Sequence, residues 1–262
     1  MIARGYPVPS RPVRSTLRTG DLVPDHTARL LRADGFVAKA RPLSGTPGAV
    51  HLVTVDGAAG PSLAALQNWL SELTAQGVRL VRTGALGPTT CSAYEEAGFA
   101  MRQELALLSH PLTELPQARA VPRPTRLRRP VPHDPVALAM IDRRAFGATW
   151  GLDIAGIVDA CHATPVHRLR VAATRRLACG YAISGRAGRN AYLQRLAVDP
   201  SIQGAGIGRA LVVDSLKWAA RHRATSLVVN THVDNEPALH LYRSLGFVEL
   251  SYRLGVLERK LS

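Results

Sequence analysis

The chain has little cysteine, few aromatic residues and no long apolar run. Its 262 residues include 3 cysteines, which form no CxxC pair, and 5% aromatic residues. An odd number of scattered cysteines argues against a disulfide framework and fits reduced, buried thiols. Arg, Gly or Pro interrupts each apolar run well before about 18 residues, so we expect no membrane span. Residues 1–17 lack the apolar core of a secretory signal. The sequence therefore predicts a soluble, cytoplasmic protein.

The composition also lacks the patterns of a metal site. The 9 histidines form no HExxH motif and no other ligand spacing, so we expect no metal. Hydrophobic residues make up 46% of the chain and charged residues 20%, which is typical of a globular protein and not of a disordered one.

Basic charge is abundant, with a formal net charge of +14. Five arginines and no acidic residue lie within 119–132. This cluster leaves open a nucleic-acid-associated protein as an alternative, but the scarcity of aromatic residues argues against base stacking. The pattern favours a solvated Arg-rich surface that would accept an anionic ligand over one that binds nucleic acid.

Proline and arginine concentrate between two patterned regions, which predicts a linker over residues 119–126. It separates an N-terminal domain, 1–118, from a C-terminal domain, 127–262. The second region alternates apolar patterns of helical and strand period. Helices are predicted over 136–146, 154–162, 208–221 and 237–245, and strands over 168–173, 178–184, 191–198, 227–230 and 247–258, with residue 127 opening a possible first strand and a GRAG hairpin turn at 185–188. This order predicts an α/β protein with a mixed sheet.

The two halves repeat each other near their ends. Trp69, RLVRT and YEEAGF in the first half match Trp218, SLVVNT and YRSLGF in the second. Counted back from the Gly-Phe pair, the tryptophans lie at 30 and 29 residues and Tyr94 and Tyr242 at 5 residues each. The shared order predicts a duplicated fold.

A glycine-rich segment carries the strongest chemical signal. The predicted strand ends at Val198, and Gly204, Gly206 and Gly208 precede an amphipathic helix. Alternate glycines let backbone N–H groups converge, and the helix N-terminus adds its positive dipole end. The pattern predicts a cradle for a diphosphate. The GxGxxG spacing of a dinucleotide fold fails at Arg209, and no P-loop GK[ST] follows.

With QGAGIG between YLQRLAVDPSI and NTHVDNEPALHLYRSLGF, residues 127–261 resemble the GCN5-related N-acetyltransferase (GNAT) superfamily. The tandem layout is similar to that of two-domain members such as mycothiol synthase. The resemblance implies a splayed mixed β-sheet flanked by helices, with acetyl-CoA as the acyl donor held in the split. The backbone of the glycine segment would bind the pyrophosphate and the main chain of the preceding strand would pair with pantetheine. The implied cofactor-binding residues are Leu196, Ala197, Val198, Gln203, Gly204, Ala205, Gly206, Ile207, Gly208 and Arg209.

A second motif lies on the last predicted helix. Asn235, Ala238 and Tyr242 are spaced i, i+3 and i+7 and therefore share one face. That face would present an amide, a gap and a phenol along an extended ligand. By the resemblance, Asn235 and Ala238 would contact the cofactor, and Tyr242 would also protonate the departing CoA thiolate. A core tyrosine with a satisfied hydroxyl is the alternative.

The general base is less clear, because the strand 192–195 reads YLQR and has none of the carboxylates that GNAT members often use there. His232 is the second catalytic candidate since histidine titrates near neutral pH, although it could be an ordinary loop histidine. Glu249 and Glu258 are weaker candidates.

The first half keeps Tyr94 but not the other motifs. VDGAAGP, 55–61, replaces the glycine segment, and Gly87-Pro88 replaces Asn235. We expect no catalysis there and a role in covering the second half. The sequence thus predicts one N-acetyltransferase site that transfers an acetyl group directly to an amine, either a small molecule or a protein N-terminus or lysine. A non-catalytic acyl-CoA-binding module remains the other alternative. Monomer and homodimer are both open.

Overall fold

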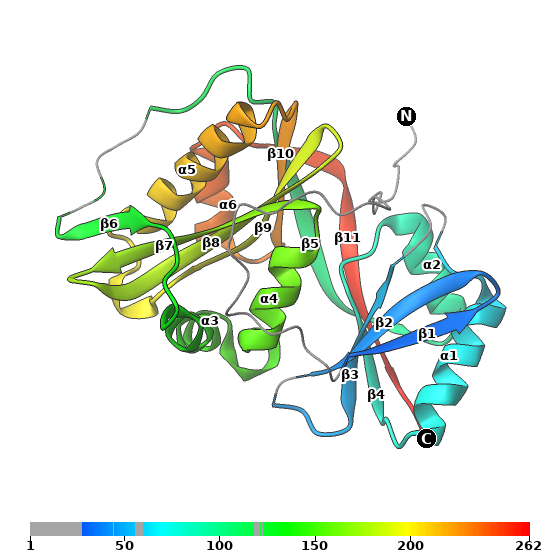
Figure 1. Ribbon diagram of the computed structural model, residues 1–262. Coiled ribbons are helices and arrows are strands. Elements are labelled where there is room, and N and C mark those ends of the chain that lie inside the picture. The colour runs from blue at the N-terminus through cyan, green and yellow to red at the C-terminus, as the bar shows by residue number, and fades with distance from the viewer. Residues whose placement is uncertain (1–27, 44, 56–59, 118–120, 122) are drawn as a thin grey trace.

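A computed structural model describes residues 28–262 apart from 44, 56–59, 118–120 and 122 (Figure 1). The described residues form one mixed sheet of 11 strands in the order β1-β2-β3-β4-β11-β5-β10-β9-β8-β7-β6. The strands are β1 Arg29–Ala33, β2 Phe36–Pro42, β3 Ala49–Thr54, β4 Leu80–Thr83, β5 Ala100–His110, β6 Thr125–Arg128, β7 Val166–Thr174, β8 Leu177–Ala187, β9 Asn190–Val198, β10 Ser226–His232 and β11 Val248–Lys260. The helices are α1 Leu63–Ala75, α2 Pro88–Glu96, α3 Asp134–Trp150, α4 Ile154–His162, the short 3₁₀ turn η1 Pro200–Ile202, α5 Ile207–Arg221 and α6 Glu236–Arg243.

The two halves exchange their last strands. Strand β5 ends the first half, yet it pairs antiparallel with β10 of the second half on one side and with β11 on the other. Strand β11 ends the second half, yet it lies between β5 and β4. In Figure 1 these two long strands run side by side from one half into the other. Each half therefore contains a strand that the other half supplies.

Helices cover the sheet in a different way in each half. In the first half α1 and α2 pack on β1–β4 around the fully buried Trp69. In the second half α5 and α6 cover one face, and α3 and α4 cover the opposite face of β7–β9 (Figure 1). Successive residues of β10 alternate between these faces, because Leu227 and Val229 join the α5 core while Val228 packs in a separate cluster on the other side.

The sheet splits in the second half and stays closed in the first. Pairing between β9 and β10 stops at Tyr192–Val228, although β9 runs on to Val198 and β10 to His232. In the first half the equivalent strands β3 and β4 are paired through Leu52–Thr83, and the next amide, of Gly84, still donates to the Leu52 carbonyl at 3.2 Å. The predicted splayed sheet is confirmed for the second half.

The predicted duplication is visible in the local structure. Gly98 and Gly246 end α2 and α6 with φ of 80° and 87°, in the left-handed region that glycine tolerates. The amide of Phe99 donates to the Tyr94 carbonyl at 3.0 Å, and that of Phe247 donates to the Tyr242 carbonyl at 3.1 Å. The same capped turn therefore directs β5 and β11 out of the two helices.

Most predicted elements of the second half are present, with shifts at their ends. The hairpin predicted at 185–188 is present between β8 and β9. Its turn begins later than predicted, at Gly188 with φ of 58°, because residues up to Ala187 continue β8. Strand β6 begins at Thr125, inside the predicted linker, because it pairs with Thr174 of β7. Among the described residues, no helix is long and apolar enough to cross a membrane.

Candidate active site

The glycine-rich loop runs from the end of β9 to the start of α5. Gly204 and Gly206 both have φ of 80°, and no atom lies within 4 Å of where a Cβ would stand on either. Residues 203–206 are all exposed. The loop therefore presents its backbone to solvent, which a side chain at either glycine would strain or cover.

The first turn of α5 offers free backbone donors. The amides of Ile207, Gly208 and Arg209 have no carbonyl one turn earlier in the helix to receive them. Gly206 is the N-cap, supplies no side-chain cap and has its carbonyl bonded to the Ala210 amide at 3.0 Å. The first turn contains no acidic residue. Its positive end can therefore receive an anion.

The loop, α5 and α6 meet at the end of β9. A Cβ on Gly208 would lie 3.6 Å from Leu241 on α6 and 3.9 Å from Val198 on β9. Arg209 Nη1 donates to Ser244 Oγ at 3.3 Å, and Arg209 Nε is buried without a partner among the described residues. The guanidinium is thereby held between α5 and α6 beside the loop.

The free side of β9 faces the split. The Asp199 amide donates to the Cys179 carbonyl of β8 at 3.0 Å, and backbone groups in a strand alternate in direction. The backbone groups of Leu196 and Val198 therefore point away from β8. The Val198 carbonyl accepts a 3.1 Å hydrogen bond from Gln203 Nε2, so this acceptor is occupied, while the side chain of Ala197 is buried on the α3–α4 face.

Asn235 begins α6 as its N-cap. Its Oδ1 accepts from the Ala238 amide at 3.3 Å, and its Nδ2 donates to Thr231 Oγ1 at 3.0 Å. The side chain thus joins β10 to α6. Ala238 packs against the same core as Tyr242, so the three residues share the inner face of the helix as their spacing predicts.

Tyr242 is 4% exposed and packs on Phe247, with ring centroids 5.5 Å apart. Burial raises the pKa of its phenol. The hydroxyl has no hydrogen-bond partner within the described part of the chain, but it is not one of the fully buried unpaired polar atoms there. With its pKa raised, the phenol is protonated at neutral pH and can act as a proton donor.

His232 ends β10 and does not lie in the loop beyond it. Its Nδ1 accepts from the Asp234 amide at 3.1 Å. In a neutral imidazole one nitrogen carries the proton and only the other has a lone pair. Because that lone pair receives the Asp234 amide, His232 can take a proton only when this bond opens.

The sequence analysis missed a buried charge network on the other face of β9. Asp142 of α3 is 0% exposed, and its carboxylate accepts from Arg195 Nε at 2.8 Å and Nη2 at 2.6 Å. It also accepts from the Tyr181 hydroxyl and the Leu152 amide, each at 2.5 Å. With four donors it is structural and is not a free base. The signal was Arg195 itself, because an arginine within a strand that is buried on both faces needs a carboxylate partner.

In the first half, side chains occupy the region that corresponds to the split of the second half. Most of the predicted replacement for the glycine segment, 56–59, lies outside the described residues. The pair Ala49–Leu80 in the first half corresponds to the pair Ala191–Leu227 in the second. Counting equally far along β3 and β9 from these pairs makes Thr54 the equivalent of Leu196. Thr54 Oγ1 and Tyr94 Oη lie 3.0 Å apart in a hydrogen bond.

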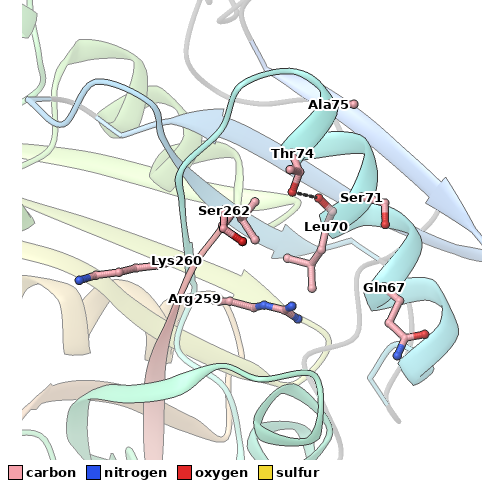
Figure 2. A pocket seen from close by; sticks show the side chains of 9 residues that line it. Gln67, Leu70, Ser71, Thr74, Ala75, Arg259, Lys260 and Ser262 are labelled. Atoms are coloured by element: carbon pink, nitrogen blue, oxygen red, sulfur yellow. Dashed lines mark hydrogen bonds between the residues drawn. The ribbon is translucent and has the colours of Figure 1, made fainter.

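A separate hollow lies between α1 and the end of β11, with a volume of about 500 Å³ (Figure 2). None of the predicted site residues line it, so it is not a candidate for the active site. Its lining residues are Gln67, Leu70, Ser71, Thr74, Ala75, Arg259, Lys260, Leu261 and Ser262.

Residues 137–247, which hold the glycine loop, Asn235 and Tyr242, match the family model of the acetyltransferase (GNAT) family. Over this range the chain is similar to the GNAT family. The matched range ends at Phe247, the last residue of the repeated Gly-Phe turn.

Two curated relatives resemble shorter stretches. The chain is 42% identical over 52 residues to a mycothiol acetyltransferase of Acidothermus cellulolyticus, covering 20% of this chain and 16% of that protein. It is 38% identical over 78 residues to the N-alpha-acetyltransferase RimI of Mycobacterium tuberculosis, covering 28% of this chain and 48% of that protein. The matches thus span less than half the length of either relative.

Solved structures extend the likeness of fold over both halves. A GCN5-related N-acetyltransferase from Kribbella flavida aligns with a TM-score of 0.62 and 14% identity, over 88% of this chain and 89% of that one. A tandem GNAT protein from the clavulanic acid biosynthesis pathway aligns with a TM-score of 0.62 and 15% identity, over 92% and 86%. The chain therefore shares its fold with these structures over both halves.

Proposed function

We propose that this protein is an acetyl-CoA-dependent N-acetyltransferase with one working site in its second half. The observation that carries the proposal is the exposed glycine loop at the free N-terminus of α5, placed where β9 and β10 separate. A split sheet beside a diphosphate cradle accommodates a long ligand with an anionic end, which is the shape of coenzyme A.

The residues around the split fit this ligand. The amides of 203–208 would bind the diphosphate, with the guanidinium of Arg209 beside it. The backbone of Leu196 and Val198 would pair with the pantetheine arm, once Gln203 releases the Val198 carbonyl. Asn235 and Ala238 line the neighbouring face of α6.

Acetyl-CoA would supply an activated acetyl group, which an amine of the acceptor attacks at the carbonyl carbon. As the bond between carbon and sulfur breaks, Tyr242 would donate its phenol proton to the sulfur. The raised pKa keeps that proton on the phenol at neutral pH. The product amide must lose a proton from nitrogen, and His232 is our candidate to accept it after its bond to the Asp234 amide opens.

The thiols support direct transfer, without a covalent acyl-enzyme. Burial raises the pKa of Cys91 and Cys179 above the ordinary value and that of Cys161 to about 12. All three are therefore thiols and not thiolates at neutral pH, and a thiol is a poor nucleophile.

Calorimetric titration with acetyl-CoA tests the proposal. Gly206→Glu places a carboxylate where the diphosphate would bind and should abolish binding. The matched control is Gly35→Glu, since Gly35 has φ of 78°, lies in an exposed turn of the first half and also has no atom within 4 Å of its Cβ position. The control adds the same charge and the same backbone strain but should bind as the wild type does.

An amine screen then tests catalysis. The relatives' names point to two acceptor classes, a small molecule for mycothiol acetyltransferase and an alpha-amino group for the N-alpha-acetyltransferase. The screen therefore includes small primary amines and peptides with free N-termini or lysines. Absence of acetyl-CoA binding would refute the proposal. Binding without transfer to any amine would favour a regulatory acyl-CoA-binding module.

A further inference from the structure

The segment 146–152, which we call the bridging segment, links α3 to α4 and has an unusual backbone. Gly147 has φ of 76° and ψ of 177°, which breaks the helix inside α3. A Cβ on Gly151 would lie 2.7 Å from the Gly147 carbonyl oxygen, so no side chain fits there. Two glycines thus shape a turn that other residues cannot adopt without rearrangement.

An arginine from the second half holds one side of this segment. Arg195 Nη2 donates to the Trp150 carbonyl at 2.8 Å, and the guanidinium lies 3.6 Å from the centroid of the Phe146 ring. Because Arg195 is itself fixed by the buried Asp142, this attachment is rigid.

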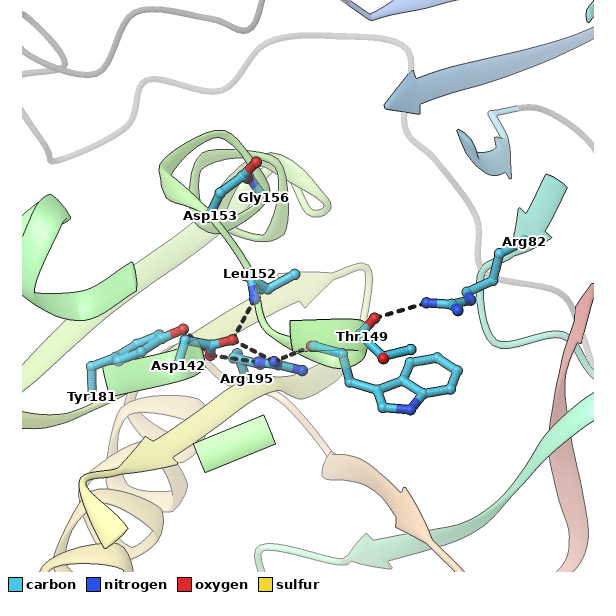
Figure 3. Close-up of polar contacts among 9 residues, drawn as sticks. Arg82, Asp142, Thr149, Leu152, Asp153, Gly156, Tyr181 and Arg195 are labelled. Atoms are coloured by element: carbon cyan, nitrogen blue, oxygen red, sulfur yellow. Dashed lines mark hydrogen bonds and ion pairs between the residues drawn. The ribbon is translucent and has the colours of Figure 1, made fainter. Parts of the chain in front are cut away.

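An arginine from the first half holds the other side (Figure 3). Arg82 of β4 is 5% exposed, donates from Nη1 to the Thr149 carbonyl at 2.8 Å and lies 4.2 Å from the centroid of the Trp150 ring. Its Nε donates to Glu258 Oε1 of β11 at 2.6 Å. The bridging segment is therefore clamped between cations from the two halves, and Arg82 holds it through two contacts while Glu258 fixes the guanidinium from the other side.

The bridging segment lies on the face of the sheet away from the glycine loop. Trp150 packs against a buried cluster that includes Leu105 and Leu107 of β5, and Val228 of β10 packs against the same cluster. The neighbouring Leu227 belongs to the α5 core instead. Val228 is the last residue of β10 that pairs with β9. Trp150 and Val228 therefore belong to one cluster, which lies beside the start of the split on its α3–α4 face.

This placement matters because the two substrates must meet in the split. With coenzyme A bound along α5 and the glycine loop, an amine can reach the thioester only through the opposite face. The bridging segment borders that approach. Arg82, which helps to fix the segment, comes from the first half, whose sheet has no split.

We propose that Arg82 is a positioning residue for the acceptor, acting through the bridging segment. The first half thereby contributes to amine binding in the second without touching either substrate. This inference rests on the proposed function, and it concerns the binding of the amine and not of acetyl-CoA.

The test compares Arg82→Lys with Arg102→Lys in the full-length protein. Lysine at 82 keeps the charge beside Glu258 but loses the planar group that serves Thr149 and Trp150 together. Arg102 is the matched control, because its Nε lies 3.7 Å from the same Glu258 carboxylate and its side chain is 57% exposed. The readouts are amide exchange of residues 147–152 and KM for both substrates, with the best amine from the screen as acceptor.

We expect Arg82→Lys to speed exchange across the bridging segment and to raise KM for the amine about tenfold, with KM for acetyl-CoA unchanged. Arg102→Lys should change neither. Trp150→Leu removes the stacking surface but leaves Arg82 paired with Glu258, so it should give the same direction of change if Arg82→Lys does not fold.

Unchanged exchange in Arg82→Lys would show that Arg82 does not hold the segment. Faster exchange with an unchanged KM for the amine would show that the segment does not position the acceptor. Either result overturns the proposal. Failure of the proposed function is distinct, because it appears as absent acetyl-CoA binding in the wild type.

Discussion

Thr54 and Tyr94 share a hydrogen bond of 3.0 Å between their hydroxyl oxygens, across the place where the first half would need an open split. The equivalent tyrosine of the second half, Tyr242, has no such partner among the residues described, and its strand neighbour at the position of Thr54 is Leu196. The first half therefore has a hydroxyl at this strand position, in Thr54, and a closed sheet. The second half has an apolar side chain there, in Leu196, and an open sheet.

The first prediction is that the protein binds one molecule of acetyl-CoA. In the first half β3 stays paired with β4 up to the last residue of β4, Thr83, and Pro61 removes one amide donor from the segment that replaces the glycine loop. Calorimetry should give a stoichiometry of one for the wild type. A second site that persists in Gly206→Glu would show that the first half binds the ligand as well.

The second prediction concerns the two tyrosines. Tyr242→Phe removes a hydroxyl that has no partner within the described chain, so we expect little change in the free energy of unfolding. It should lower kcat about 10²-fold, the lower end of what a general acid contributes. Acetylation rates with saturating acetyl-CoA, together with urea unfolding, measure both effects.

Tyr94→Phe is the control for that substitution and should show the reverse. It breaks the bond to Thr54, which should lower the free energy of unfolding by about 1 kcal/mol, and it should leave kcat unchanged. If Tyr242→Phe retains full activity, another group or solvent protonates the sulfur, and Tyr242 is a core residue.

Local features of this fold could be predicted from the sequence. The alternate glycines before α5 and the repeated Gly-Phe pair each depend on a few neighbouring residues, and the structure has a loop and two matching turns at these places. These signals are local because backbone conformation at a cap or turn is decided within about one helical turn.

Partners far apart in the sequence could not be predicted in the same way. The apolar pattern of β5 and β11 indicates a strand but does not say which strand lies beside it. Asp142 and Arg195 are 53 residues apart, and only the packing of α3 on β9 brings them together. For the same reason the linker predicted at 119–126 separates the two halves along the sequence only, because in space the exchanged strands join them.

The third prediction follows from that exchange: residues 119–262 should not fold alone. Without β5, the strand β10 loses its partner along Leu227–His232, and β11 loses its longest ladder. The α5 core also loses Ala106 and Leu108. Unpaired apolar edges favour aggregation, so the fragment should be insoluble when expressed alone.

Co-expression of 1–118 with 119–262 provides the control. We expect the two pieces to assemble and to recover acetyl-CoA binding, since β5 would then be available to β10 and β11. A monomeric 119–262 fragment that unfolds cooperatively would contradict this prediction and support an independent second domain.

The fourth prediction is a pH dependence of stability that comes from His51. This residue of β3 pairs with Arg41 on one side and Arg82 on the other, and burial, followed by the charges of these arginines, lowers its pKa from 6.5 to about 4, against the opposing charge of Asp159. The unfolded chain therefore binds a proton between pH 6.5 and 4 that the folded protein does not. Stability is fully present above pH 6.5 and falls as the pH drops towards 4, by about 3 kcal/mol at most.

Urea unfolding of the wild type and His51→Gln at pH 7, 6 and 5 measures this effect. The wild type should lose stability across the series, and His51→Gln should lose less, because glutamine takes up no proton in either state. His240→Gln, at an exposed position on α6, is the matched control and should follow the wild type. Parallel profiles for the wild type and His51→Gln would mean that His51 is protonated as easily in the folded protein as in the unfolded chain. The arginines beside it would then not repel its charge, and other groups would cause any loss of stability at low pH.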